Sequence, residues 1–281
     1  MRIATALLFL TTALTAQDRL LQPDDVAARK AAAAVLAFGI DSWRTLGEGE
    51  GSTRLHAAVG TAQQCLPAGS TARTTLDAIA ASDKAPKSVA SALVDLVEDL
   101  TFQPVAEAEL PAGMPGFQAL DEIELRNYPT YRMVRSGMRG GAMGAFWPLF
   151  NHIKEREIAM TTPVQVDYRQ DGERQREASM AFLYGSPELG PTGKAGDVEV
   201  VDVPAMTVLT IGSRGQDRPA RITELRTRLE QWLATHQEWE VAGTVRTMGY
   251  NSPSVGGERR YFEVQLPVRK RQTAERLRQS V

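Results

Sequence analysis

The sequence has little of what covalent cross-links and metal centres need. It contains one cysteine, Cys65, which excludes an intramolecular disulfide, a multi-thiolate zinc site and the Cys-x-x-Cys-His attachment of c-type haem. It contains three histidines, His56, His152 and His236, so a multi-histidine metal centre is not expected. Lys and Arg (32) nearly balance Asp and Glu (34), and this lack of a basic excess argues against nucleic acid as the main partner.

Apolar runs long enough to cross a membrane are also missing. The run at residues 3–10 follows the positive charge of Arg2 and falls well short of the ~20 residues that span a bilayer. A charge, a short apolar run and small residues are typical of a secretory signal peptide. We predict such a peptide at residues 1–16, with cleavage after Ala16 or alternatively after Ala13, and therefore expect an exported protein, periplasmic or secreted.

Residues 17–103 are predicted to form a small helical domain. Apolar residues recur there at helical spacing, and helix-starting residues precede the apolar stretches at Pro23, Ser52, Ser70 and Pro86. No motif in this half carries chemistry. We expect it to be either a module that binds a protein partner or a cover for the second half.

A linker is predicted at residues 104–117, which include Pro104, Pro111 and Pro115. Beyond it, β-branched residues alternate with polar ones, as in half-buried strands, over a second domain at residues 118–268. Residues 269–281 form a basic tail that is either solvated or bound to an anionic surface.

The second domain contains an internal repeat. Residues 123–140 (IELRNYPTYRMVRSGMRG) align without a gap with residues 198–215 (VEVVDVPAMTVLTIGSRG). We interpret each copy as one strand bent at its proline, Pro129 or Pro204. A helical stretch and two further strands follow each copy, predicted at 158–168 and 179–184 in the first and at 245–250 and 261–268 in the second. The unit is therefore β-α-β-β, present twice, with a natural ligand cleft between the halves.

These segments carry a family resemblance. The runs ELRNYP (124–129), FWPLFNHI (146–153) and IAMTTPV (158–164) resemble motifs of the SOUL/haem-binding-protein family, as do YNSP (250–253) and EVQLPV (263–268). The resemblance implies an α+β fold, a duplicated β-α-β-β barrel with two flanking helices that is shared with GyrI-like small-molecule-binding domains. It also implies non-covalent binding of haem or a related tetrapyrrole in an apolar cleft.

A porphyrin needs an apolar slot and basic groups for its carboxylates. We expect the slot from side chains on and around the first helix of the second domain: Met138, Met143, Phe146, Leu149, Phe150, Ile153 and Met160. Arg139, Lys154 and Arg156 are placed to reach the carboxylates. The competing interpretation is that the apolar residues form ordinary core and that the charges are solvated.

The iron ligand is the least specified part of this site. His152 is the candidate, at an angle of ~110° from the centre of its helix's apolar face, and His236 is a second candidate on the later helix. Ligation by methionine or tyrosine, and an unligated porphyrin, stay open.

Two other classes of function compete with tetrapyrrole binding. No G-x-S-x-G, H-E-x-x-H or phosphate-loop motif is present, so we do not expect an enzyme. A non-haem small-molecule binder or hydrolase of the GyrI-like group would need a buried carboxylate beside an aromatic residue, for which Glu263 with Tyr250 or Tyr168 are the candidates. A non-enzymatic interaction protein would use the helical half as its partner surface.

Overall fold

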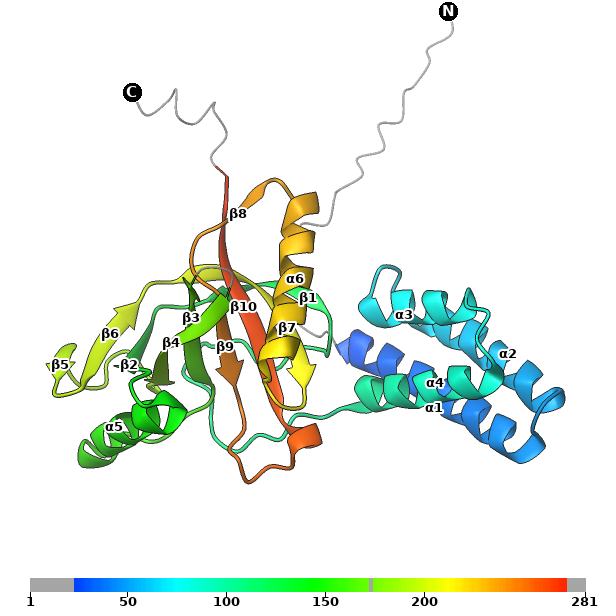
Figure 1. Ribbon diagram of the computed structural model, residues 1–281, viewed down its shortest axis with the longest axis horizontal. Coiled ribbons are helices and arrows are strands. Elements are labelled where there is room, and N and C mark those ends of the chain that lie inside the picture. Colours follow the sequence, from blue (N-terminus) through cyan, green and yellow to red (C-terminus); the bar gives the residue numbers. More distant parts are fainter. Residues whose placement is uncertain (1–22, 172–173, 272–281) are drawn as a thin grey trace, which may run out of the picture.

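The computed structural model describes residues 23–171 and 174–271 (Figure 1). The predicted signal peptide at residues 1–16 and most of the predicted basic tail lie outside the described residues. A bundle of helices lies beside an antiparallel sheet that carries its own helices (Figure 1), so the predicted α+β class is confirmed. Among the described helices, none combines the length and the hydropathy that a membrane crossing requires.

The helical bundle consists of α1 (Pro23–Leu46), α2 (Glu50–Cys65), α3 (Thr71–Ala80) and α4 (Pro86–Thr101). Its core is formed by the predicted apolar stripes, including Leu36, Leu55, Leu76 and Leu93, each with no exposed surface. The expectation that Ser52 caps the second helix is wrong. Gly49, at φ 92°, takes the cap position and lets the chain turn earlier, so that α2 begins at Glu50.

The strands form a 10-stranded sheet in the order β1-β7-β10-β9-β3-β4-β2-β6-β5, with β8 paired to β10. Their bounds are β1 (Ile123–Tyr128), β2 (Tyr131–Gly137), β3 (Val164–Asp171), β4 (Arg174–Leu183), β5 (Gly193–Ala195), β6 (Val198–Val203), β7 (Met206–Arg214), β8 (Trp239–Val241), β9 (Arg246–Gly249) and β10 (Tyr261–Lys270). The described strands make an open path from β1 to β5, so the closed barrel that the family resemblance implied is not formed. The short strands β5 and β8 were not predicted.

Each predicted bent strand is in fact two strands, and this part of the sequence interpretation is wrong. β1 and β2 are separated at Pro129, and β6 and β7 at Pro204. After the break the chain does not continue in the same ladder, because β1 pairs with β7 whereas β2 lies between β4 and β6. A proline cannot donate a ladder hydrogen bond, so it ends the first strand and the chain crosses to a different neighbour.

The strand order from β1 to β6 is symmetric about its centre. Each strand of the first predicted unit has the same position, counted from one end, as the corresponding strand of the second unit has from the other end. In the first unit β2, β4 and β3 are neighbours, and in the second unit β7, β10 and β9. The first strand of each unit, β1 or β6, pairs with the second strand of the other unit. The two units therefore share one sheet through the central β9–β3 pairing and through these exchanged outer strands.

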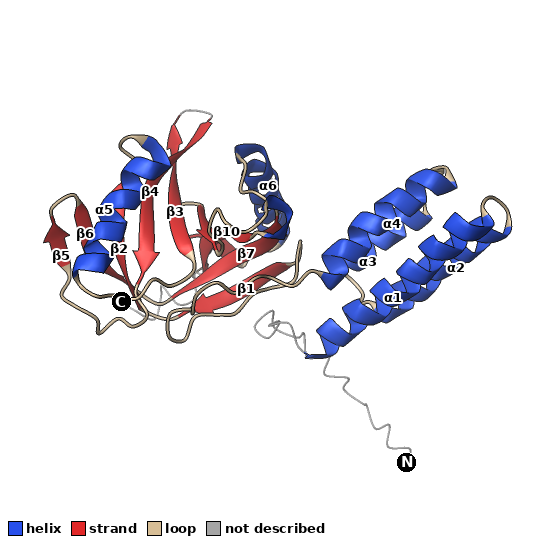
Figure 2. Cartoon of the chain, turned by 90° about the horizontal axis from the view of Figure 1, so that it is seen from below, coloured by secondary structure: helices blue, strands red, loops and turns tan. Residues whose placement is uncertain are grey.

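Helices α5 (Gly141–Glu155) and α6 (Pro219–Thr235) lie on the same side of the sheet (Figure 2). This side, the helix face, is apolar. α6 packs on Leu209, Ile211 and Val264, and α5 packs on Val134 and Phe182. Because side chains of a strand alternate between faces, the residues between these point to the opposite side, which we call the polar face.

The polar face is covered by residues 102–120, the covering segment, which runs along the sheet without regular secondary structure (Figure 2). Phe102, Leu110 and Phe117 pack against Tyr250 and Tyr261, and Met114 packs against another apolar cluster of this face. The predicted linker at 104–117 thus does more than connect two domains.

Charged contacts hold the helical bundle against the sheet. Arg214 of β7 lies 2.6 Å from Asp99 and 3.1 Å from Glu98 at the end of α4. Glu122, just before β1, accepts a 3.0 Å hydrogen bond from the backbone N–H of Thr71 at the start of α3. Burial raises the pKa of Asp99, although its bond to Arg214 acts in the opposite direction.

The two sides of α5 should differ sharply in their effect on stability. Leu149 is fully buried against the sheet, so Leu149→Ala is expected to lower the free energy of unfolding by about 2–5 kcal/mol through lost burial and a residual cavity. Met143 on the same helix is 60% exposed, and Met143→Ala should change stability by less than about 0.5 kcal/mol. Urea unfolding followed by circular dichroism measures both, and equal losses would contradict the described orientation of α5.

Candidate functional site

Helix α5 carries most of the predicted site. It begins at Gly141, preceded by its cap residue Gly140, and the φ angles of 76° (Gly140) and 75° (Gly141) are ones that only glycine adopts readily. These residues turn the chain sharply from β2 onto the helix face. Gly144 then lies so close to Arg139 that an added Cβ would be 2.1 Å from the Arg139 carbonyl oxygen, so this first turn requires glycine as well.

The structure divides the predicted site residues, other than His152, into three groups by their exposure. Leu149 and Ile153 are core residues of the helix face, at 0% and 4% exposure, so for these two the competing core interpretation holds. Met138, Phe146 and Phe150 are half-buried at the edge of the same cluster. The remaining predicted residues are exposed: Met143, Met160, Arg139, Lys154 and Arg156.

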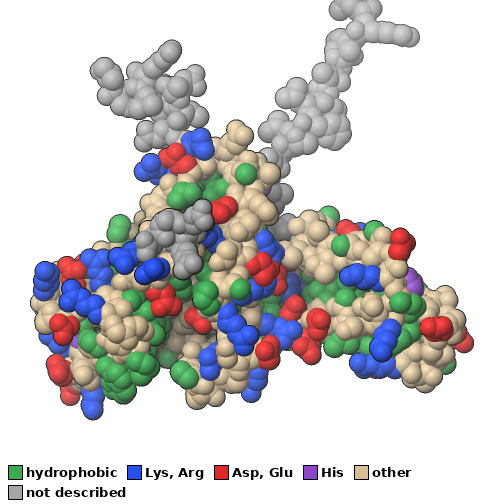
Figure 3. Space-filling view, in the orientation of Figure 1, with side chains coloured by type: hydrophobic (Ala, Val, Ile, Leu, Met, Phe, Trp, Pro, Cys, Tyr) green, Lys and Arg blue, Asp and Glu red, His purple; other side chains and the backbone are tan. Residues whose placement is uncertain are grey.

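An exposed apolar patch lies on the outer side of α5. We call the side chains of Met143, Phe146, Trp147 and Phe150 the α5 patch, and apolar side chains gather over this helix in Figure 3. The rings of Phe146 and Phe150 are nearly parallel, with centroids 5.8 Å apart and an angle of 13°. Trp147 meets both rings edge-on, at 5.6 and 5.9 Å, and 52% of its surface is exposed.

Trp147 was missed by the sequence analysis. The helix was treated as having one apolar face, formed by positions 146, 149, 150 and 153. In the structure Leu149 and Ile153 face the sheet, whereas Trp147 lies on the outer side next to Phe146 and Phe150. The spacing of Trp147, one residue after Phe146 and three before Phe150, was the sequence signal that could have revealed a second apolar side.

His152 points away from the α5 patch. At ~100° per residue, His152 lies roughly 140° around the helix from Trp147 and 180° from Met143. It is 4% exposed, and its Nε2 forms a 2.8 Å hydrogen bond with the hydroxyl of Tyr184 at the end of β4. Burial, followed by the charge of Arg156, lowers the pKa of His152 below its usual value of 6.5.

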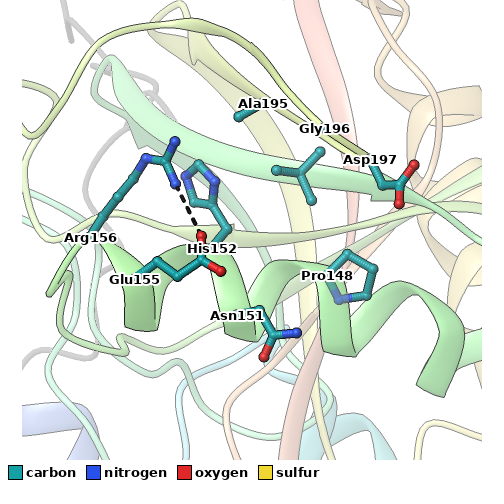
Figure 4. Close-up of a pocket in the computed structure, with 9 residues that line it drawn as sticks. Pro148, Asn151, His152, Glu155, Arg156, Ala195, Gly196 and Asp197 are labelled. Carbon is teal, nitrogen blue, oxygen red and sulfur yellow. Dashed lines mark ion pairs between the residues drawn. The ribbon is translucent and has the colours of Figure 1, made fainter.

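Beside His152 lies a pocket of about 400 Å³ between α5 and the turn that joins β5 to β6 (Figure 4). Its polar side chains are Asn151, Glu155, Arg156 and Asp197, with Arg156 4.0 Å from Glu155. Within the described ranges, no three His, Cys, Asp or Glu side chains are grouped closely enough to hold a metal ion. The pocket thus offers polar contacts, and the predicted apolar slot and His152 are not in one place.

His236, the second candidate ligand, is also engaged. Its ring stacks on Trp232 with centroids 3.6 Å apart, and its Nδ1 lies 2.8 Å from the Trp232 carbonyl oxygen. It lies at the C-terminal end of α6, on a different helix from the α5 patch.

The polar face holds the carboxylate of the competing hypothesis. Glu263 of β10 is fully buried, and its Oε1 lies 3.0 Å from Nη1 of Arg126 and 3.1 Å from the Tyr261 hydroxyl. The ring of Tyr250 lies 5.2 Å from that of Tyr261, tilted by 59°, in the same cluster. Tyr168 belongs to the helix face instead, so the structure brings Glu263 together with Tyr250 but not with Tyr168.

These groups form a connected network rather than an isolated acid. Gln265 donates to Glu263 at 2.8 Å and to the Tyr128 hydroxyl at 2.6 Å, and its Oε1 accepts from Arg246 at 2.9 Å. Burial, the largest single effect, lowers the pKa of Arg126, but the combined charges of Glu263, Tyr128 and Glu124 outweigh it and the pKa is raised. Burial and the Glu263 carboxylate raise the pKa of Tyr128 and Tyr261, so both phenols stay protonated.

The lowered pKa of His152 predicts a pH effect on stability. The folded protein holds the ring neutral, whereas the unfolded chain takes up a proton near pH 6.5, so the free energy of unfolding should fall as the pH drops below 6.5. His152→Gln keeps a hydrogen-bonding group at this position and does not titrate, so it should lose that part of the pH dependence. Urea unfolding between pH 7.5 and 5.0 compares the two proteins, and identical pH profiles would refute the assignment.

Three comparisons relate this chain to known proteins. A search of curated proteins finds no match. Among solved structures, the C-terminal domain of EcmrR is similar at a TM-score of 0.44 and 15% identity, covering 54% of this chain and 99% of that one. A hydrolase from Listeria innocua is similar at a TM-score of 0.40 and 11% identity, covering 53% of this chain and 93% of that one.

A family model decides the assignment. The model described as SOUL heme-binding protein matches residues 114–267, which is more than half of the chain and includes every strand of the sheet apart from the last residues of β10. The matched range also contains α5, α6 and the end of the covering segment. The chain therefore belongs to the SOUL heme-binding protein family.

Proposed function

We propose that this protein binds haem or a related tetrapyrrole non-covalently on the α5 patch. Membership of the SOUL family supports binding of a small molecule, and the observation that favours a porphyrin is the patch itself. Exposed aromatic and thioether groups gather there on one side of a helix, in a protein whose other large apolar side chains are mostly buried. Such a surface is typical of a binding site.

The chemistry of the patch suits a flat amphipathic ring. The nearly parallel rings of Phe146 and Phe150 and the exposed Trp147 offer stacking contacts, and the flexible side chain of Met143 adapts to an irregular outline. Arg139 precedes the helix and Lys154 is in its last turn, and both are exposed. Since α5 rises ~1.5 Å per residue, Lys154 is ~12 Å along the axis from Phe146, within a porphyrin's reach.

Iron ligation by His152 would require a rearrangement, because its Nε2 is engaged by Tyr184. On the patch itself, the side chain able to ligate iron is the exposed thioether of Met143. We therefore propose that the porphyrin occupies the α5 patch without His152. Haem, when bound, supplies the redox and ligand chemistry, and the protein residues bind and orient it.

A haemin titration read by Soret absorbance tests this proposal. A saturable one-to-one band shift is expected, and Trp147→Ala should raise the Kd about tenfold, since a stacked aromatic side chain contributes on the order of 1–1.5 kcal/mol. His152→Ala should leave the band unchanged. Phe38→Ala, which removes a 66% exposed aromatic ring from α1, is the matched control and should not change the Kd.

Three results would contradict the proposal, each in a different part. If Trp147→Ala binds haemin as the natural protein does, the α5 patch is not the site. If no saturable binding occurs, the non-haem alternative, a small-molecule binder or hydrolase, takes its place. Loss of the ligand-dependent features in His152→Ala would instead establish His152 as the axial ligand.

We further propose that the protein is exported, on the sequence pattern of residues 1–16 alone. Expression of the full chain in a bacterial host with intact secretion should then yield a mature protein in the periplasm that begins at Gln17. Mass spectrometry of the purified protein gives the N-terminus, and Ala16→Leu should block cleavage there. An unprocessed cytoplasmic protein would contradict export.

The helical half is proposed to serve a protein partner as well as to cover the sheet. Phe38 and Leu46 of α1 are 66% and 43% exposed, whereas the remaining apolar stripe of this helix is buried. These two side chains are the part of the bundle that is available to a partner.

A further inference from the structure

The polar face is built like an occupied binding site. The ion pair of Arg126 with Glu263 is removed from water, and a buried ion pair adds little stability compared with an apolar core of the same volume. Its cover is an irregular segment, and long irregular segments in compact domains are commonly functional. A sheet that only needed a cover would use apolar side chains here, as the helix face does.

The covering segment binds this face as a peptide would. The carbonyl oxygen of Gly116 accepts a hydrogen bond from Arg126, and the backbone N–H of Gln118 donates to the Tyr261 hydroxyl at 3.1 Å. Between them the ring of Phe117 lies 5.0 Å from Tyr250 and 5.2 Å from Tyr261. Two of these contacts use only main-chain groups, and the third uses an aromatic ring, so another segment with an aromatic residue can reproduce all three.

Two guanidinium donors of the polar face have no hydrogen-bond partner within the described residues: Nε of Arg126, which lies 3.5 Å from Glu124, and Nη2 of Arg246. Arg246 of β9 is 4% exposed and donates to Gln265 and to the Tyr131 hydroxyl, but within the described residues its Nη2 has no hydrogen-bond partner. Tyr131 belongs to the cluster on which Met114 of the covering segment packs, so this donor lies close to the bound segment. A buried guanidinium N–H favours a ligand with a carboxylate or amide oxygen.

An exposed residue attaches the first half of the segment, and a pocket borders its second half. Glu107 is exposed and accepts hydrogen bonds from the backbone N–H of Ser252 at 2.6 Å and from its hydroxyl at 2.8 Å. Phe117 and Gln118 border a pocket of about 220 Å³ that also contacts Arg29 and Asp99 of the helical bundle. Release of the Glu107 contact would weaken this attachment, leaving the main-chain hydrogen bonds of Glu109 with Thr162 and of Ala112 with Gly185 to be broken when the segment lifts.

We propose that the polar face is a peptide-binding groove, which this chain fills in cis with residues 114–118 and which a partner's extended segment enters when the covering segment lifts. The partner segment carries an aromatic side chain in the place of Phe117 and an acidic or amide side chain for Arg246. The groove is on the opposite side of the sheet from α5, so this site is separate from the proposed tetrapyrrole site.

The test is a titration of full-length protein with a fluorescent synthetic peptide of residues 108–120 (AELPAGMPGFQAL). In the natural protein the peptide competes with a tethered copy of itself, whose effective concentration is of the order of mM, so binding should be weak. Glu107→Ala frees the outer clamp and Phe117→Ala vacates the ring position. Each variant should bind the peptide at least tenfold more tightly than the natural protein.

Matched controls separate this groove from other apolar surfaces. A peptide with alanine at the Phe117 position should not bind, and Leu189→Ala, at a 42% exposed apolar residue, should bind the natural peptide no better than the unaltered chain does. Circular dichroism establishes that each variant is folded, and Glu107→Ala, at an exposed residue, keeps the test decisive if Phe117→Ala unfolds. Absence of saturable binding to folded Glu107→Ala, or equal binding of the alanine peptide, would overturn the proposal. Haemin binding is measured independently, so failure of either proposal leaves the other standing.

Discussion

The fold depends on the alternation of side chains along the central strands, because the two faces of one sheet pack against different covers. Helices α5 and α6 cover the apolar helix face, and the covering segment covers the polar face. On β10, Phe262, Val264 and Leu266 pack under α6, whereas Tyr261, Glu263 and Gln265 join the polar network. A shift of one residue in the pairing with β7 would place Glu263 against α6. The register is therefore fixed twice, by apolar packing on one face and by hydrogen bonds on the other.

The polar network also links parts that are distant in the chain. Arg126 and Tyr128 come from β1, Glu263 and Gln265 from β10, and Gly116 from the covering segment. Because each buried polar group needs its partner, loss of any one strand leaves the others unsatisfied. The helical bundle is joined to this arrangement through Asp99 and Glu122 at the edge formed by β1 and β7.

Much of the fold was accessible from the sequence, because its signals are periodic. The stripes containing Leu36, Leu55 and Leu93 predicted the helices, and the alternation in residues 261–268 predicted the last strand. The crossing of the chain at Pro129 was not predicted, since the sequence shows where a strand ends but not which neighbour the next one finds. The covering segment has no periodicity, so its place over Glu263 was not foreseeable, although Glu263 itself was singled out as a buried acid.

The sequence predicted the helix that carries the proposed site. It did not predict which side chains of that helix face the sheet and which are exposed. Phe146 and Phe150 are half-buried on α5, whereas Leu149 and Ile153, predicted for the same slot, belong to the core, and Trp147 lies on the exposed side. His152 is a polar residue in a buried position, and its partner Tyr184 lies 32 residues further on, a pairing that no local pattern reveals. Contacts between distant segments thus decided which residues of one helix share a surface.

The exchange of outer strands has a consequence for how the chain folds. Asn127 of β1 and its partner Thr207 of β7 are 80 residues apart, so β1 emerges from the ribosome long before the strand that completes its ladder. Until then its edge and the side chains of Arg126 and Tyr128 have no native cover, and closing so long a loop is slow. Neither of the two predicted units can complete its ladders alone, and the sheet is expected to assemble as a single cooperative event after the second unit has been synthesised.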